Sequence, residues 1–205
     1  MATADPTKYL WWLVSRASGI VALALITITV VLGLTMSTKL LQRPGIGKVL
    51  VRLHEQLALL GFAAIAVHGL SLLGDPWLNP GLRGLLVPFS MSYRPIFTGL
   101  GIIAGYLSAA LGLSYYLRRR IGAKRWRTLH RATLLAWLLA VVHTLGAGSD
   151  ATTLWLRAGV LAPSVPVVYL TILRILGGRP REARPVAATG GAATPRRAAL
   201  AEEPS

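Results

Sequence analysis

The 205-residue sequence contains no cysteine. Disulfides, iron–sulfur clusters, thiolate ligands to a metal and cysteine nucleophiles are therefore all excluded. Acidic residues are also scarce, because only seven aspartates and glutamates accompany 22 lysines and arginines. With so few carboxylates, no pair suited to general acid–base catalysis is evident.

Apolar residues, by contrast, are abundant. They make up 54% of the chain, against 14% charged residues, which is too apolar for an ordinary soluble domain of this size. A bilayer core of about 30 Å needs roughly 20 apolar residues per helix. Five runs of about that length are bounded by charge or by Pro and Gly: 10–36, 49–73, 96–117, 128–145 and 153–176. We therefore expect an all-α integral membrane protein, a bundle of five transmembrane helices.

The first of these runs lies close to the N-terminus. It is longer than the apolar part of a signal peptide, lacks a convincing small-residue cleavage site and carries Arg16, so we expect a retained helix. The segment 74–95 is rich in turn residues and predicts a longer external loop. In the third span, Gly101 and Gly105 form a GxxxG pattern, which we interpret as close helix packing.

The net charge of +15 comes from basic residues that gather in alternate loops beside the predicted spans. They lie before the second span, before the fourth span and after the fifth span. Because cytoplasmic loops carry an excess of Lys and Arg, the N-terminus is expected outside and the C-terminus in the cytoplasm. This placement favours membrane lipids as the partners of the charge and argues against nucleic acid.

Three segments are expected along the chain. Residues 1–9 form an external N-terminal segment, residues 10–176 the transmembrane bundle, and residues 177–205 a cytoplasmic tail. The tail consists largely of Pro, Arg, Ala and Gly without apolar periodicity, which is typical of disorder. It is too short for a flavin or nicotinamide domain, and no Rossmann glycine motif follows a strand.

All four histidines of the chain lie within predicted spans or at their edges. Burying an ionisable side chain in a bilayer is costly, so such residues are functional by default. His54 and His68, in the second span, are fourteen residues apart, a rise of about 21 Å; His130 and His143, in the fourth, are thirteen apart, about 19.5 Å. Both spans run from cytoplasm to exterior, so His54 is expected level with His130 and His68 with His143.

Two axial imidazoles from two facing helices can hold a haem iron, and imidazole is the natural ligand in a chain without cysteine. We therefore predict two haems, with the inner iron between His54 and His130 and the outer iron between His68 and His143. One difficulty is that thirteen residues on an ideal helix leave His130 and His143 about 140° apart. Overwinding, tilt or unequal haem orientation is then required. Helix packing and a zinc or copper site are the alternatives, although no carboxylate or thiolate converges on these positions.

The two histidine segments are HEQLALLGFAAIAVH, residues 54–68, and HRATLLAWLLAVVH, residues 130–143. They resemble the ferric reductase-like transmembrane proteins, which include NADPH oxidases, ferric reductases and the haem-binding membrane subunit of the periplasmic methionine sulfoxide reductase system. That family carries two histidines thirteen or fourteen residues apart on one helix and two about thirteen apart on a parallel helix. The resemblance covers roughly residues 10–146. This chain departs from it in having five predicted spans rather than six and in lacking flavin and nicotinamide domains.

The resemblance implies a membrane cytochrome with two b haems that passes electrons outward to ferric iron, oxygen or a reductase partner. It also implies that Arg16, about two turns into the first span, forms a salt bridge to a propionate of the outer haem. Snorkelling of Arg16 to the headgroups is the alternative. Trp137, midway along the fourth span, is interpreted as a core or lipid-facing residue rather than one between the haems.

The predicted function is thus the transmembrane electron-transfer component of an oxidoreductase. A separate electron donor and an external acceptor, a protein or a small molecule, are expected as partners. A quinol-linked membrane anchor subunit is one alternative, and a non-redox scaffold or assembly protein is another. A flavin or a quinone as a further cofactor has no supporting motif. The expected location is the cell membrane, of the bacterial inner-membrane type.

Overall fold

The computed structural model of the protein describes residues 9–38, 40 and 44–177. The described part of the chain is helical and contains no strand. Five of its helices are long and apolar enough to cross a membrane, which confirms the predicted all-α membrane bundle. Most of the expected external segment 1–9 and of the expected tail 177–205 lies outside the described residues.

The five spans are built from seven helices: α1 (Leu10–Thr38), α2 (Ile46–Ser71) with η2 (Leu72–Gly74), α4 (Pro95–Leu113), α6 (Ala123–His130) with α7 (Thr133–Ala147), and α8 (Leu154–Gly177). Two short helices lie in the connections: α3 (Gly81–Leu86) and α5 (Arg118–Ile121). The third span ends four residues earlier than its apolar run suggests. Residues 114–117 form turns whose N–H groups bond three or four residues back.

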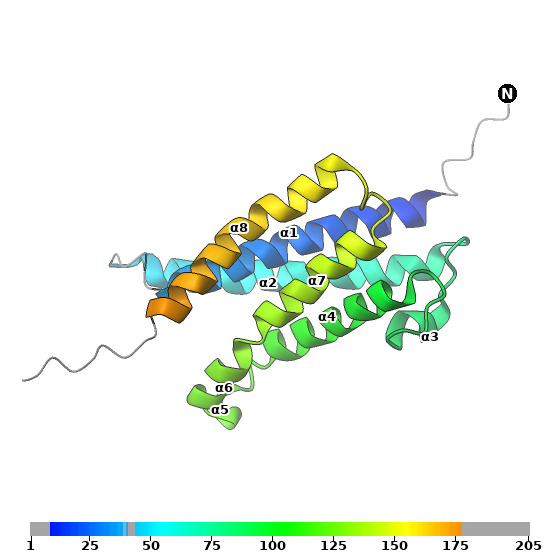
Figure 1. The fold of residues 1–205 in the computed structure, drawn as a ribbon. Helices are drawn as coiled ribbons and strands as arrows, with labels where there is room; N and C mark the ends of the chain where they lie inside the picture. The colour runs from blue at the N-terminus through cyan, green and yellow to red at the C-terminus, as the bar shows by residue number, and fades with distance from the viewer. Residues whose placement is uncertain (1–8, 39, 41–43, 178–205) are drawn as a thin grey trace, which may run out of the picture.

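The bundle consists of two groups of helices. α1 packs along α2 and α8, and α4 packs along α7, while α7 also contacts α1 (Figure 1). A buried core joins α1, α7 and α8, and it includes Leu34, Trp137 and Val167. Large apolar side chains such as Leu60, Leu135 and Val165 are exposed along the spans, as expected for surfaces that meet lipid.

The fourth span is interrupted at Arg131 and Ala132, between α6 and α7. The N–H groups of residues 131, 132, 134 and 135 bond to carbonyls three residues back, which is the 3₁₀ pattern. A 3₁₀ turn has about 3.0 residues where an α-helix has about 3.6, so each residue adds about 20° of rotation. Four such residues supply about 80° of the roughly 140° that separates His130 from His143 on an ideal helix. Overwinding, one of the expected solutions, is therefore present.

Candidate functional site

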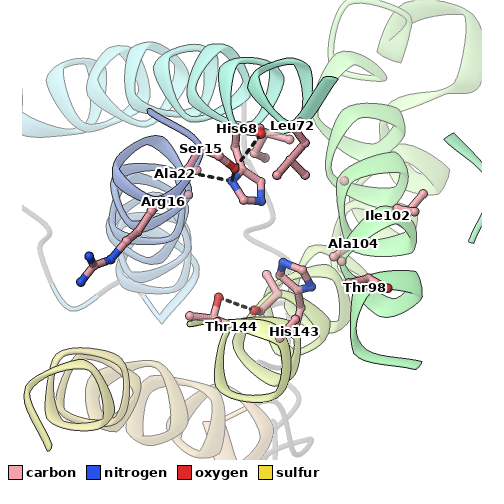
Figure 2. Close-up of a pocket in the computed structure, with 18 of the residues that line it drawn as sticks. Ser15, Arg16, Ala22, His68, Leu72, Thr98, Ile102, Ala104, His143 and Thr144 are labelled. Carbon is pink, nitrogen blue, oxygen red and sulfur yellow. Dashed lines mark hydrogen bonds between the residues drawn. The ribbon is translucent and has the colours of Figure 1, made fainter. Parts of the chain in front are cut away.

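The four histidines form two pairs, each joining α2 to the fourth span. The ring centroids of His54 and His130 are 6.2 Å apart, with an angle of 69° between the ring planes. Those of His68 and His143 are also 6.2 Å apart, with an angle of 74°. Figure 2 shows the second pair, with the imidazoles pointing toward each other from opposite helix groups. The side chains are thus paired as the topology predicted.

One nitrogen of every imidazole is committed to the backbone of a neighbouring helix. The Nδ1 atom donates to a carbonyl in each case: His54 to Thr29 (2.9 Å), His68 to Ser15 (2.8 Å), His143 to Phe97 (2.8 Å) and His130 to Leu111 (3.4 Å). A carbonyl oxygen only accepts, so Nδ1 carries the hydrogen and Nε2 keeps its lone pair. Nε2 is therefore the atom available to a metal, and the bond at Nδ1 fixes the tautomer and orientation of the ring.

The separation of the rings fits one metal between each pair. An imidazole nitrogen lies about 1 Å from its ring centroid and about 2 Å from a metal that it binds, so two rings on one metal have centroids about 6 Å apart. Within the described residues, no cluster of three or more His, Cys, Asp or Glu side chains could hold an ion. Each pair offers a metal two imidazole nitrogens, and a haem iron takes its other ligands from the porphyrin.

The His68–His143 pair lies in a cavity of about 780 Å³. The cavity is bounded by α1, α2, α4 and α7 and by the connection that carries α3. Its lining is mainly apolar, with Arg16 and Asp150 among the few charged residues. This size is within the range of roughly 300–1,000 Å³ that is usual for cofactor sites. An apolar planar group with charged substituents suits such a lining.

Arg16 lines this cavity and forms an ion pair with Asp150. Its guanidinium also lies 5.1 Å from the ring centroid of Trp12 and 5.8 Å from that of Trp155. The side chain is directed away from the two imidazoles in Figure 2. The ion pair was missed at the sequence level, because Asp150 follows the fourth span and only the folded bundle brings it beside α1.

An aromatic cluster adjoins the His54–His130 pair. The indole of Trp126 stacks on the His130 ring, with centroids 4.9 Å apart and an angle of 27°. Trp126 Nε1 also donates to the Ser114 hydroxyl at 3.1 Å. Sequence reasoning missed this residue, because it lies in a basic segment before the predicted start of the span. Nearby, the Tyr116 hydroxyl donates to Glu55 at 3.1 Å, and this bond raises the pKa of Tyr116.

The fold and the two pairs define a class, the multi-pass helical membrane proteins whose spans carry histidines paired across helices. Residues 18–141 match the family model described as the ferric reductase like transmembrane component. This match covers more than half of the chain, and the chain belongs to that family. The resemblance drawn from the histidine segments is confirmed.

Several curated bacterial relatives are similar to the chain. It is 30% identical over 178 residues to the protein-methionine-sulfoxide reductase heme-binding subunit MsrQ of Bordetella pertussis, covering 86% of this chain and 75% of that protein. It is 34% identical over 130 residues to the MsrQ of Azospira oryzae, with 63% and 50% coverage. For Cronobacter sakazakii MsrQ the identity is 33% over 145 residues, with 69% and 65% coverage. No solved structure matches the chain significantly. The five spans and these relatives identify a multi-pass protein of the bacterial inner membrane.

Proposed function

We propose that the protein is a b-type membrane cytochrome that carries electrons across the inner membrane through two haems. His54 and His130 would hold one haem, and His68 and His143 the other. The observation that carries this proposal is the pair of 6.2 Å separations, each with Nδ1 already bonded and no third protein ligand among the described residues. The haem-binding name of the relatives supports the same cofactor.

Haem iron supplies reversible one-electron chemistry, and the protein supplies binding, orientation and electrostatics. If both imidazoles of a pair held a haem iron, that iron would have no position left for a substrate. The pairs therefore suit electron transfer and not chemistry on a bound molecule. The Nδ1 hydrogen bonds make the imidazoles more basic ligands, which favours the ferric state.

The proposed direction of electron flow is inferred from the distribution of basic residues. The connection that follows α4 carries Arg118, Arg119 and Arg120, and it adjoins the His54–His130 end of the bundle. By the positive-inside rule this end faces the cytoplasm, so His54 and His130 form the inner pair and His68 and His143 the outer pair. Electrons would enter from a separate donor at the inner pair and leave outward from the outer pair.

Arg16 is proposed as a partner of an outer-haem propionate. It lines the cavity of the outer pair, and its guanidinium has five N–H donors, of which Asp150 can engage only some. The remaining donors suit a second carboxylate. Snorkelling to headgroups explains the position less well, because the guanidinium is already held by Asp150 and two tryptophans.

The proposed acceptor is a partner protein outside the membrane. The relatives are named as subunits of a protein-methionine-sulfoxide reductase, which favours an external reductase over ferric iron or oxygen. This chain would then be the electron-transfer component of that oxidoreductase. Its own described residues provide the path across the membrane.

The test is the optical spectrum of the purified full-length chain. We expect a reduced-minus-oxidised spectrum of b type and about two haems per chain. His143→Leu should remove mainly the outer haem and His130→Leu mainly the inner one. Leu138→Ala, on an exposed position of the same helix as His143, should keep both. A folded chain that binds no haem at full haem supply would overturn the proposal.

A further inference from the structure

Three of the four histidine contacts share one construction. The carbonyl that accepts the Nδ1 hydrogen belongs to a helix residue, and the residue four positions later in that helix is a glycine. The pairs are Ser15 with Gly19 for His68, Thr29 with Gly33 for His54, and Phe97 with Gly101 for His143. Two of these glycines lie on α1 and one on α4.

Helix geometry explains why the fourth residue matters. Side chains on an α-helix lean toward its N-terminus, so residue i+4 stands over the turn that contains the carbonyl of residue i. Any side chain there covers the outward side of that carbonyl. A glycine leaves it open, and an imidazole from another helix can then reach the oxygen.

The distances show how closely the histidine rings approach these three glycines. A Cβ atom added to Gly19 would lie 2.9 Å from His68 Nδ1, and one added to Gly33 would lie 3.2 Å from His54 Cε1. At Gly101 it would lie 2.6 Å from His143 Cε1 and still nearer to Nδ1. In all three cases the atoms nearest to the added Cβ belong to the histidine ring.

Other glycines of the spans contact different groups. A Cβ at Gly61 would meet Ile26, and one at Gly112 would meet Phe62, which are ordinary helix-packing contacts. At Gly105 the nearest atom, from Ile65, is 3.9 Å away. The sequence-level interpretation of Gly101 as a packing residue is therefore incomplete.

The fourth contact, that of His130, has no glycine at the corresponding position. His130 bonds to the carbonyl of Leu111, and the residue four positions later is Tyr115, beyond the end of α4 at Leu113. This carbonyl also accepts a hydrogen bond from the Ser114 hydroxyl at 2.6 Å. The ring is instead flanked by the stacked indole of Trp126.

We propose that Gly19, Gly33 and Gly101 are positioning residues for the haem ligands. Each keeps one carbonyl open, so that the ligand ring is held in one plane with its Nδ1 hydrogen donated. This inference rests on the proposed haem function. An added methyl group would push the ring away and lengthen the Nδ1 bond. The imidazole would become a weaker ligand for ferric iron, so that haem would be held less firmly and its midpoint potential would rise.

The effect should be graded and specific to one haem. Gly101→Ala places the methyl group nearest to its histidine, Gly19→Ala is intermediate, and Gly33→Ala needs a shift of only a few tenths of an ångström. The first two variants act on the outer pair and the third on the inner pair. A general packing defect would show neither this order nor this division.

The experiment compares the three variants with wild type as the purified full-length, haem-loaded chain. Gly47→Ala in α2 and Gly159→Ala in α8 are matched controls, because a Cβ added at either position meets nothing within 4 Å beyond its chain neighbours and the adjoining helix backbone. The measurements are the haem-to-chain ratio, a redox titration that resolves both haems, and the electron paramagnetic resonance spectrum of the ferric state.

We expect Gly101→Ala to weaken outer-haem binding roughly tenfold, as other losses of hydrogen bonds to metal-bound histidines do. If the loss falls entirely on the ferric state, a tenfold change raises the outer midpoint potential by about 59 mV. The ferric signal of that haem should shift, while the inner haem keeps its potential. Gly33→Ala should instead shift the potential of the inner haem, by a smaller amount, and leave the outer haem unchanged. Both controls should match wild type.

Folded Gly101→Ala protein with two haems, unchanged potentials and unchanged ferric signals would overturn the inference. If that variant does not fold, the milder Gly33→Ala decides, and an unchanged inner potential there would overturn the inference as well. Failure of the proposed function has a different signature, because wild type itself would then contain no haem.

Discussion

The indole Nε1 of Trp137 donates a hydrogen bond to the Thr27 hydroxyl at 3.0 Å. Both side chains are buried, and Trp137 is seven residues from His130 and six from His143 along the fourth span. Thr27 in turn donates to the carbonyl of Leu23 at 2.7 Å. This hydrogen bond joins α7 to α1 at a depth between the two histidine pairs. Trp137 is therefore a core residue.

Replacing Thr27 with valine should therefore lower stability without removing haem. The substitution leaves a buried indole N–H without a partner, which costs about 1–3 kcal/mol. Thermal unfolding in detergent should show a lower midpoint for Thr27→Val, with the reduced spectrum retained. Thr128→Val, at an exposed helical position, is the control. Loss of one haem at unchanged stability would instead place Trp137 in contact with the cofactor.

Trp126 should affect only the inner haem. Its indole stacks on His130, whose Nδ1 bond of 3.4 Å is the longest of the four, so the stack restrains this ring. Trp126→Leu should change the midpoint potential and the ferric resonance signal of the inner haem and leave the outer haem as in wild type. Trp11→Leu, at an exposed position of α1 outside the cavity of the outer pair, should change neither. Equal shifts of both haems in Trp126→Leu would contradict this assignment.

Substitution of Arg16 and substitution of Asp150 should shift the midpoint potential of the outer haem in opposite directions. A cation near the haem disfavours the more positive ferric state, and an anion favours it. Arg16→Gln should therefore lower the midpoint potential of the outer haem, and Asp150→Asn should raise it. A redox titration at low ionic strength checks both signs. If both variants lose stability while the outer potential stays fixed, the pair only joins α1 to the connection between α7 and α8.

Tyr116 should ionise only at a pH above its ordinary range. The phenol donates to Glu55, which stabilises the protonated form and raises the pKa. The hydrogen bond therefore stabilises the folded protein at neutral pH. This stabilisation is lost as the pH rises through the raised pKa of Tyr116. Glu55→Gln should bring the phenolate transition, followed by ultraviolet absorbance, back toward ordinary tyrosine. Tyr116→Phe identifies which of the six tyrosines gives the transition.

The arrangement of the spans and the pairing of the histidines could be predicted from sequence. Apolar length fixes what can cross a bilayer, and loop charge orients successive spans. Those two constraints alone brought His54 level with His130 and His68 level with His143. The span ends were less accurate, because Tyr115, Tyr116 and Leu117 are apolar enough to extend a run although the helix has ended.

The partners of the site residues could not be predicted in this way. Asp150 reaches Arg16, and Trp126 reaches His130, only through the course of the connecting segments. Gly101 fits the common pattern of helix packing, and nothing in its local sequence indicates a histidine 42 residues later. These contacts depend on how two helices are rotated about their axes, which periodicity does not determine.

The overwound turn at Arg131 and Ala132 has a consequence for recognising such proteins. Neither residue is a proline or a glycine, so no familiar helix breaker marks the place where the extra rotation enters. A search for paired intramembrane ligands that assumed ideal helices would reject the thirteen-residue interval and discard this chain. A search that allowed one tight turn at the edge of a span would keep it, together with unrelated chains that share the same device.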